Sequence, residues 1–416
     1  MNEQAIDVAV IGAGPAGLAA AIKAKEAGAE KVTIMERAEQ LGGLLHQCIH
    51  NGFGLVYFNE DLTGPEYARR FVEKAMDLKI DIQLESMVLD LTAAKRITVS
   101  SREGLRYLHP KALVLAMGCR ERTRHQIMIP GTRPAGIFTA GTAQRYVNVE
   151  GYIPGKKIVI LGSGDVGMIM ARRLTLEGAK VEAVIEILPY VGGLIRNEVQ
   201  CVYDFNIPLF LEHTVTEIIG LTRVEAVTIA MVDKNQEPIA GTEKTIECDT
   251  LLTSVGLIPE NELSLKAGIR IDPITGGPFV SGTMETSILG IFASGNVVHV
   301  NDLVDNVTLE SEVAGACAAD YAMGKVLPAK RNIGLQAGEN IRYIVPHTIG
   351  MEREVTLSMR VREPREKVRL RIGDILTKPL RVVKPSEMLK VNLTLEQLGK
   401  IEERTSEVEV SCEKMG

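Results

Sequence analysis

One glycine-rich pattern in this sequence has the residue types and spacing to bind phosphate groups, and it occurs twice. The pattern is G-x-G-x-x-G, followed by a glutamate and then by a Gly-Gly-Leu run. A single G-x-G-x-x-G is a weak signal, but two complete copies in one chain are a strong one. The first copy is Gly12, Gly14, Gly17, Glu36 and residues 42–44, and the second is Gly162, Gly164, Gly167, Glu186 and residues 192–194.

Each residue type in the pattern has a physical role. The first glycine permits a tight turn, the second lets the backbone approach a pyrophosphate, and the third lets a helix pack closely on a strand. The N–H groups at the start of that helix attract phosphate, and the glutamate accepts the hydroxyl groups of a ribose. The two motifs therefore predict two dinucleotide-binding sites, and the alternative is a generic helix–strand turn with incidental glycines.

The residues around each motif predict the βαβ unit that must position it. Short apolar runs that end at a glycine are typical of buried parallel strands, and stretches rich in Ala, Lys and Glu favour helices. The first unit is predicted as strand 7–11, helix 15–27 and strand 32–35, and the second as strand 157–161, a helix that ends at 177 and strand 181–185.

With both motifs present, residues 1–330 resemble the pyridine nucleotide–disulfide oxidoreductase superfamily, whose flavoproteins contain two dinucleotide-binding domains. Three further runs are similar to its landmarks, namely residues 112–118, 250–256 and 290–296. The resemblance implies that the first unit holds FAD. It also implies that the second unit, inserted into the first domain, holds a nicotinamide nucleotide.

The expected fold class is α/β, with two Rossmann-like three-layer dinucleotide-binding domains, the second inserted in the first, and a small β-rich C-terminal domain. In the C-terminal part, alternating Val368, Leu370 and Ile372 predict a half-buried strand with a basic outer face, and one helix is expected at 395–402. We expect this part either to dock onto another subunit or to cover the FAD-binding domain as a lid. The implied domains are 1–120 with 251–330 for FAD, 121–250 for NAD(H), and 331–416 for the β-rich part.

The resemblance also carries cofactor-binding positions over to this chain. Asn296 stands where the family usually has an aspartate that contacts the ribityl chain, so an amide replaces a carboxylate there. The residues that we expect to contact the cofactors are Gly12, Gly14, Pro15, Ala16, Gly17, Glu36, Arg37, Gly43, Leu44, Gly118, Gly162, Gly164, Asp165, Val166, Gly167, Glu186, Gly256, Gly295, Asn296 and Asp302.

Acidic residues near the two later motifs bear on cofactor choice and helix capping. Glu186 favours NAD(H) over NADP(H), because a carboxylate repels a 2′-phosphate and bonds free ribose hydroxyls. Asp165 lies inside the second glycine turn, where we expect it to be the helix N-cap, at the cost of some repulsion of the pyrophosphate. His299, Asp302 and Asp305 precede or begin a predicted helix. We expect them to cap it, and contact with the pyrimidine edge of the flavin is the functional alternative.

The six cysteines do not form a redox dithiol, since no two of them are close in sequence and no C-x-x-C occurs. A thiol–disulfide relay needs two sulfurs, so disulfide reduction is disfavoured. No metal site is expected either. Cys48 and His50 are the catalytic candidates, because this stretch lies against the isoalloxazine ring in family members. Cys48 could tune the flavin or form an adduct, and His50 could shuttle a proton. The alternative is that Cys48 is a buried thiol and that His46 and His50 are satisfied polar groups.

A closer resemblance is to flavoprotein components of multi-subunit dehydrogenases, such as opine and proline oxidases, hydrogen cyanide synthase and a companion of glycerol-3-phosphate dehydrogenase. Residues 47–55, 62–67 and 295–305 carry it. It implies FAD-dependent, NAD(H)-linked hydride transfer between nicotinamide and flavin, with another dehydrogenase subunit or an iron–sulfur protein as partner. One alternative is a flavoprotein subunit that itself oxidises an amino acid, an opine or glycerol 3-phosphate, with a structural or regulatory second nucleotide domain. Another is a scaffold that keeps FAD only for stability.

The composition is that of a globular protein without a charge-driven partner. The chain has 416 residues, a hydrophobic share of 45% and a formal net charge of −6. So small a net charge argues against nucleic-acid binding and against charge-held membrane binding. Glycines interrupt the apolar N-terminal run, so neither an export signal nor a membrane span is expected. Scattered thiols favour the cytoplasm, and we expect an oligomer.

Overall fold

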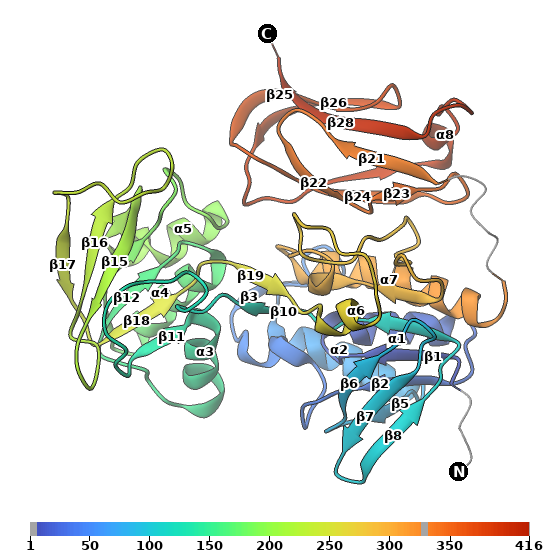
Figure 1. The fold of residues 1–416 in the computed structure, drawn as a ribbon, viewed down its shortest axis with the longest axis horizontal. Coiled ribbons are helices and arrows are strands. Elements are labelled where there is room, and N and C mark those ends of the chain that lie inside the picture. The colour runs from blue at the N-terminus through green and yellow to red at the C-terminus, as the bar shows by residue number, and fades with distance from the viewer. Residues whose placement is uncertain (1–5, 326–331, 416) are drawn as a thin grey trace. The chain divides into compact units, whose positions relative to one another are not determined.

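The computed structural model describes residues 6–325 and 332–415, and it divides the chain into two compact units (Figure 1). One unit combines the residues up to Cys119 with those from Pro259 onward, and the other is Arg120–Ile258. The expected domain boundary at 330/331 lies outside the described residues. The expected return at residue 251 would divide strand β18 (Thr250–Thr253), which is paired within the sheet of the second unit.

The first unit is built on a five-stranded parallel sheet. Its central strands are four-residue, largely apolar runs in which every residue is buried, as expected for a sheet covered on both faces. All the pairs in this sheet are parallel. The strand order is β20 (Ile291–Ala293), β9 (Ala112–Leu115), β1 (Val8–Ile11), β2 (Val32–Met35) and β5 (Asp81–Gln83).

Two helices of the first unit pack so closely that their backbones are nearly in contact. Helix α1 (Pro15–Glu26) follows β1, and α7 (Val304–Ala322) follows the last strand of the sheet. A β-carbon at Gly315 of α7 would lie 2.1 Å from the carbonyl oxygen of Ala20 in α1. The other elements are η1 (Gly43–Gln47), β3 (Asn51–Phe53), β4 (Leu62–Thr63), α2 (Gly64–Asp77), the antiparallel β6 (Met87–Leu91), β7 (Ile97–Ser101) and β8 (Gly104–Leu108), α6 (Glu262–Lys266) and η4 (Gly295–Val297).

The second unit repeats this topology, so the sequence repeat is also a structural repeat. In its parallel sheet β12 (Lys157–Leu161) and β13 (Lys180–Ile185) take the places of β1 and β2, and β18 takes that of β9. Helix α4 (Asp165–Leu176) corresponds to α1. The remaining elements are β11 (Ile137–Thr139), α3 (Ala140–Arg145), η2 (Tyr146–Glu150), α5 (Ile195–Cys201), η3 (Tyr203–Phe205), β14 (Leu209–Phe210), β15 (His213–Ile219), β16 (Ala226–Met231) and β17 (Lys244–Glu247). Two short strands, β10 (Cys119–Glu121) and β19 (Leu257–Pro259), each extend one residue beyond the limits of this unit.

Three layers are evident from strand β12. Ile158 and Ile160 pack into a core shared with α4, whereas Val159 and Leu161 pack into a core shared with β15 and β16. Successive side chains of a strand point to opposite faces, so helices cover one face of the sheet and an antiparallel sheet covers the other. The expected α/β class with Rossmann-like three-layer domains is confirmed.

The C-terminal part is β-rich, as predicted. Val368, Leu370 and Ile372 are buried, and the basic residues between them are exposed. One sheet has the order β23 (Thr348–Ile349), β21 (Ile333–Ala337), β28 (Glu407–Lys414), β25 (Arg365–Ile372) and β26 (Leu376–Val383), and the other β22 (Ile341–Val345), β24 (Val355–Val361) and β27 (Leu389–Leu393). These sheets share a single apolar core, and we call this part the C-terminal sandwich.

The predicted helix at 395–402 is wrong in length, since α8 spans only Leu395–Leu398. A capping box between Thr394 and Gln397 starts it as expected for such a pair. Gly399 follows at once, and glycine disfavours helix continuation.

Within the described ranges, no helix is long and apolar enough to cross a membrane. In the same residues, no group of three or more His, Cys, Asp or Glu side chains is placed to hold a metal ion. All six cysteines lie in these ranges, and each is a thiol rather than half of a disulfide.

Candidate dinucleotide-binding sites

The first glycine turn is shaped by close backbone approaches. Gly12 has a positive φ of 99°, and a β-carbon there would lie 2.5 Å from the carbonyl oxygen of Ala116, just beyond β9. A β-carbon at Gly17 would lie 1.8 Å from the carbonyl oxygen of Gly12. At Gly14, by contrast, a β-carbon would meet nothing within 4 Å. Backbone atoms therefore pack closely against Gly12 and Gly17, whereas the space beside Gly14 is open. A pyrophosphate needs such an open space next to the backbone.

Three predicted segments meet at the start of α1. Gly42 N donates to Ala13 O (2.8 Å), and a β-carbon at Gly43 would lie 2.9 Å from Gly14 Cα. A β-carbon at Gly295, in the last motif, would lie 2.8 Å from Ala16 Cβ. No side chain caps this helix and no acidic residue lies in its first turn. The positive end of the helix is thus available to an anion.

Glu36 closes one side of the same turn. It follows β2, its side chain is buried (8% exposed), and its carboxylate accepts from Ala13 N (2.7 Å) and Ala38 N (2.8 Å). One bond reaches each oxygen, and a carboxylate has about four acceptor positions. Both oxygens therefore keep capacity for ribose hydroxyl groups. The neighbouring Arg37 is exposed.

The second glycine turn has the same construction. Gly162 also has a φ of 99°, and a β-carbon there would lie 2.1 Å from Ser254 O, beyond β18. Glu186, 6% exposed, accepts from Ser163 N (2.9 Å) and Leu188 N (2.9 Å), one bond to each oxygen. The Ser163 hydroxyl also donates to it. At Gly164 the nearest atoms to a β-carbon belong to Ser254, at 3.5 Å or more, which is ordinary contact.

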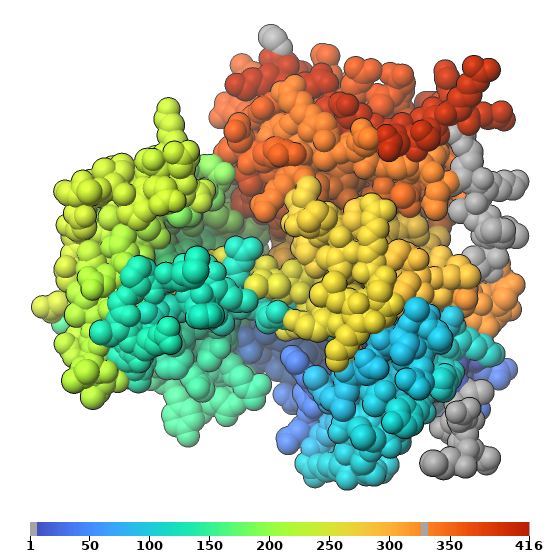
Figure 2. Space-filling view, viewed as in Figure 1, coloured from blue at the N-terminus to red at the C-terminus, as the bar shows by residue number. Residues whose placement is uncertain are grey.

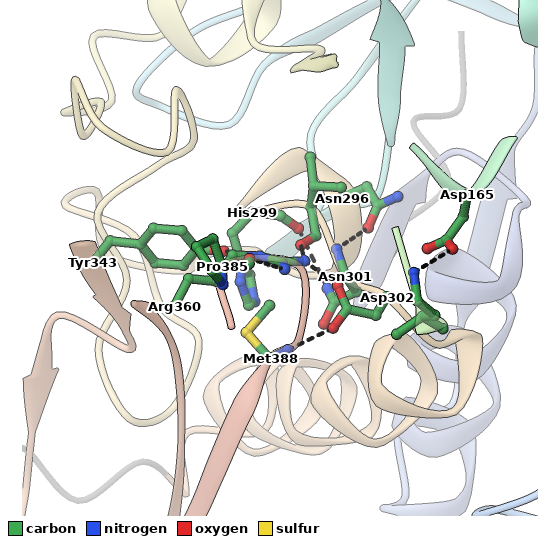
Figure 3. Close-up of polar contacts among 11 residues, drawn as sticks. Asp165, Asn296, His299, Asn301, Asp302, Tyr343, Arg360, Pro385 and Met388 are labelled. Atoms are coloured by element: carbon green, nitrogen blue, oxygen red, sulfur yellow. Dashed lines mark hydrogen bonds and ion pairs between the residues drawn. The ribbon is translucent and has the colours of Figure 1, made fainter. Parts of the chain in front are cut away.

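Asp165 is the main difference between the two turns, and the prediction that it is the N-cap of α4 is wrong. Gly164 is the N-cap, and Asp165 is the first residue of the helix. Its Oδ1 accepts from Leu194 N (2.8 Å; Figure 3) and from Asn197 Nδ2 (2.6 Å), so the carboxylate ties the loop before α5 to the start of α4. A negative charge therefore lies at the start of α4, whereas α1 begins with Pro15 and has no acid in its first turn.

Cys48 and His50 occupy the stretch between η1 and β3. Cys48 Sγ donates to Leu44 O (3.5 Å), and burial raises the pKa of the thiol to about 12. His50 Nδ1 bonds Asn51 O (2.9 Å), and its ring lies 5.2 Å from that of Phe53. A thiol with this pKa is protonated at neutral pH and is a poor nucleophile, which favours the interpretation of Cys48 as an unreactive thiol, here half-buried.

The last predicted motif and the residues just after it contain buried polar atoms that the described residues leave without a partner. Ser294 Oγ and His299 Nδ1 are both in this state. Glu310 connects the motif to α7, since its carboxylate accepts from Gly295 N (2.7 Å) and bonds His299 Nε2 (2.8 Å). Buried polar atoms are rarely left unpaired, so the motif fits a polar ligand such as the FAD that the resemblance places there.

The expected caps of α7 are wrong. Leu303 is the N-cap and makes no side-chain bond. The buried carboxylate of Asp305 instead accepts from Gly54 N (3.2 Å), Val56 N (3.2 Å) and Tyr57 N (2.7 Å), and so holds the loop after β3. Asp302 forms an ion pair with Arg360 (Figure 3), and His299 pairs with Glu310. A short polar side chain before a helix can accept hydrogen bonds from the N–H groups of its own helix or from groups far away in the sequence. The sequence alone did not distinguish these two uses.

Sequence reasoning missed Arg360. It lies in β24, between the buried Met359 and Val361, and its guanidinium is largely buried. A lone arginine in an apolar strand was the available signal, but its partners lie far away in the sequence.

Two such turns in one α/β chain define a protein with two dinucleotide-binding folds. The family model for pyridine nucleotide-disulphide oxidoreductases matches residues 6–315, and the chain belongs to this family. The cofactors of the family are FAD and NAD(P)H, and its members are oxidoreductases.

Individual relatives are distant. The chain is 26% identical over 284 residues to hydrogen cyanide synthase subunit HcnB of Pseudomonas protegens, which is 63% of this chain and 58% of the relative. It is 24% identical over 336 residues to an opine oxidase subunit of Agrobacterium tumefaciens, 76% and 65% respectively. The chain thus spans less than two thirds of either relative. The solved thioredoxin reductase of T. acidophilum matches with a TM-score of 0.64 and 24% identity over 77% of this chain and all of that one, which supports the fold.

Gly14 and Gly17 should respond differently to substitution. The β-carbon of Gly14→Val would lie in open space, so we expect a folded protein whose FAD affinity falls at least about tenfold, since the side chain fills the phosphate position. Gly17→Ala should destabilise the fold by about 3 kcal/mol, since its β-carbon collides with Gly12 O. Thermal unfolding and FAD titration of the apoprotein measure both. An unstable Gly14→Val protein, or one with unchanged FAD affinity, would contradict this assignment.

Cys48 should react slowly with alkylating agents. With a pKa near 12, its thiolate fraction at pH 8 is on the order of 10³-fold lower than that of a free cysteine. Labelling with iodoacetamide, followed by peptide mass spectrometry from pH 7 to 9, measures this rate, and Cys48→Ser identifies the peptide. Labelling as fast as that of glutathione would show an activated thiol.

Proposed function

We propose that this protein is an FAD-containing, NAD(H)-linked oxidoreductase that serves as the electron-transfer component of a larger dehydrogenase. The observation that carries the proposal is the presence of two equivalent glycine turns, each closed by a buried glutamate, in a chain whose six cysteines are all thiols. A disulfide-reducing role needs a second sulfur near the first, and Cys48 has none close in sequence.

In the proposal the first turn holds FAD. The open space at Gly14 and the uncapped start of α1 receive the pyrophosphate, Glu36 accepts ribose hydroxyls, and the unpaired Ser294 hydroxyl bonds a polar group of the cofactor. When bound, the two cofactors supply the chemistry, which is hydride transfer between nicotinamide C4 and flavin N5. The protein's own residues bind and orient, so the proposal requires no side-chain nucleophile.

Glu186 supports NAD(H) as the second nucleotide. Its carboxylate is held in place by Ser163 and Leu188, so it cannot turn away from a ribose at the end of β13. A fixed carboxylate bonds free 2′- and 3′-hydroxyls and repels a 2′-phosphate. We therefore propose NADH rather than NADPH as the electron donor or product.

The partner is proposed from the names of the relatives, which are subunits of hydrogen cyanide synthase and of opine oxidase. We propose that this chain passes electrons to or from another dehydrogenase subunit or an iron–sulfur protein. Six cysteines in the thiol form fit a reducing compartment such as the cytoplasm.

Anaerobic titration with NADH tests the proposal. We expect the visible absorbance of the bound flavin to be bleached by one equivalent of NADH, and NADPH to be at least about tenfold less efficient. Gly164→Val is the matched variant, because it alters only the second turn and should retain FAD while losing the response to NADH.

Three outcomes would contradict this function. If the chain binds no flavin, or if NADH cannot bleach the bound flavin, the proposed hydride transfer does not occur. Bleaching by an amino acid, an opine or glycerol 3-phosphate, and not by NADH, would favour a subunit that oxidises its own substrate.

Asp165 should weaken nucleotide binding. Its negative charge lies where α4 offers its positive end to phosphate, and we expect Asp165→Asn to lower the Kd for NADH about 2- to 5-fold, or ~0.3–1 kcal/mol. The asparagine oxygen can still accept from Leu194 N, so the loop should stay in place. The gain should shrink at high salt, and FAD content should not change. A Kd that rises, or that does not change at low salt, would show that the charge does not act on the ligand.

A further inference from the structure

The segment after the last glycine motif is held by the C-terminal sandwich. We call residues 295–303 the final-motif loop. Arg360 of β24 reaches this loop, where its guanidinium forms an ion pair with Asp302 and donates to Val300 O (3.3 Å; Figure 3). The same guanidinium donates to Pro385 O (2.8 Å) and to the Tyr343 hydroxyl (3.1 Å), both within the sandwich. One side chain thus connects the loop to two segments of the C-terminal part.

Both charges of this pair are removed from water. The side chains of Arg360 and Asp302 are 14% and 10% exposed. Burial is the largest single influence and opposes the charge of Arg360, but the interactions with Asp302 and with the Tyr343 hydroxyl together outweigh it, so the pKa of the guanidinium is raised. The other oxygen of Asp302 accepts from Met388 N (2.6 Å), again a group of the sandwich. A buried carboxylate separated from its partner is costly, so the loop is constrained to the place where Arg360 lies.

The constraint passes from Asp302 back to the glycine motif. Asn301 N donates to Asn296 Oδ1 (3.0 Å), and Glu310 bonds both Gly295 N (2.7 Å) and His299 Nε2 (2.8 Å). Gly295 in turn lies against Ala16 at the start of α1. Hydrogen bonds therefore connect the loop along its length, and we expect a shift at Asp302 to be passed on to Asn296 and Gly295.

We propose that Arg360 is a positioning residue of the flavin site, and that the C-terminal sandwich is a part of that site through the Arg360–Asp302 pair. Arg360 acts by holding the final-motif loop, not by touching the flavin. The inference rests on the proposed binding of FAD at the first turn. It goes beyond that proposal by assigning the C-terminal part a role in setting how tightly and how rigidly the flavin is held.

The sandwich is attached to the same unit at other points as well. It packs on the segment around residue 280 (Figure 2), where His347 N donates to Val280 O (2.9 Å) and His347 Nε2 bonds Asp272 (3.4 Å). Arg353 contacts the Cys317 thiol on α7. Neither contact involves the final-motif loop. Loss of Arg360 should therefore loosen the loop at Asp302 without releasing the sandwich, and Arg353 provides a matched control.

The experiment measures FAD affinity and the flavin spectrum of the full chain. We expect Arg360→Met to raise the Kd for FAD at least about tenfold, and to blur the vibrational shoulders of the visible flavin band as the site loosens. Arg360→Lys keeps the charge but has three donors in place of the five of the planar guanidinium, and should fall between Arg360→Met and the native protein. Arg353→Met removes a contact of the same domain and should leave both readings unchanged.

A second variant separates the proposed effect from a loss of folding. Arg360→Met combined with Asp302→Asn leaves no unpaired buried charge, so this double variant should fold even if Arg360→Met alone does not, and it should show the same loss of FAD affinity. A folded Arg360→Met or double variant with native Kd and spectrum overturns the proposal. An equal loss in Arg353→Met also overturns it, because docking alone would then explain the effect. A native chain that binds no FAD would instead refute the proposed function on which the inference rests.

Discussion

The structure depends on one steric constraint, which is the approach of a backbone carbonyl to a glycine where any side chain would collide. Ala116 O stands 2.5 Å from the β-carbon position of Gly12, and Ser254 O stands 2.1 Å from that of Gly162. In each unit this contact brings the end of a neighbouring strand onto the glycine turn. The helix that follows starts at this tightly packed turn and has no side-chain cap. A buried glutamate, Glu36 or Glu186, lies against the same turn. The phosphate-binding geometry follows from how tightly the chain is packed behind it.

The two turns share their framework but differ in charge. The first begins with Pro15 and carries no acid, whereas the second begins with Asp165, whose carboxylate is fixed by Leu194 N and Asn197. We propose that this difference suits the first turn to a cofactor that stays bound, and the second to a nucleotide that binds and leaves in each turnover. The first site has a further support, since Arg360 holds its final-motif loop from the C-terminal sandwich.

Sequence reasoning predicted the parts of this protein that depend on local patterns. The paired glycine motifs, the buried strands beside them and the alternation around Leu370 all follow from spacing and periodicity within short windows, and the fold class was confirmed. It failed where a polar side chain had both a local and a distant use. Asp165, Asp302 and Asp305 were expected to cap helices, but each instead bonds a group that another element brings close. Such pairs need the tertiary structure, because nothing in the spacing selects the distant partner.

Native mass spectrometry of the chain with FAD and NAD⁺ present tests the central claim most directly, because it counts the ligands on each molecule. Our account predicts a species that carries one FAD and one NAD⁺, and it predicts that Gly164→Val retains the FAD and loses only the NAD⁺. A native chain that never binds a second nucleotide, or that fills both turns with FAD, would contradict it.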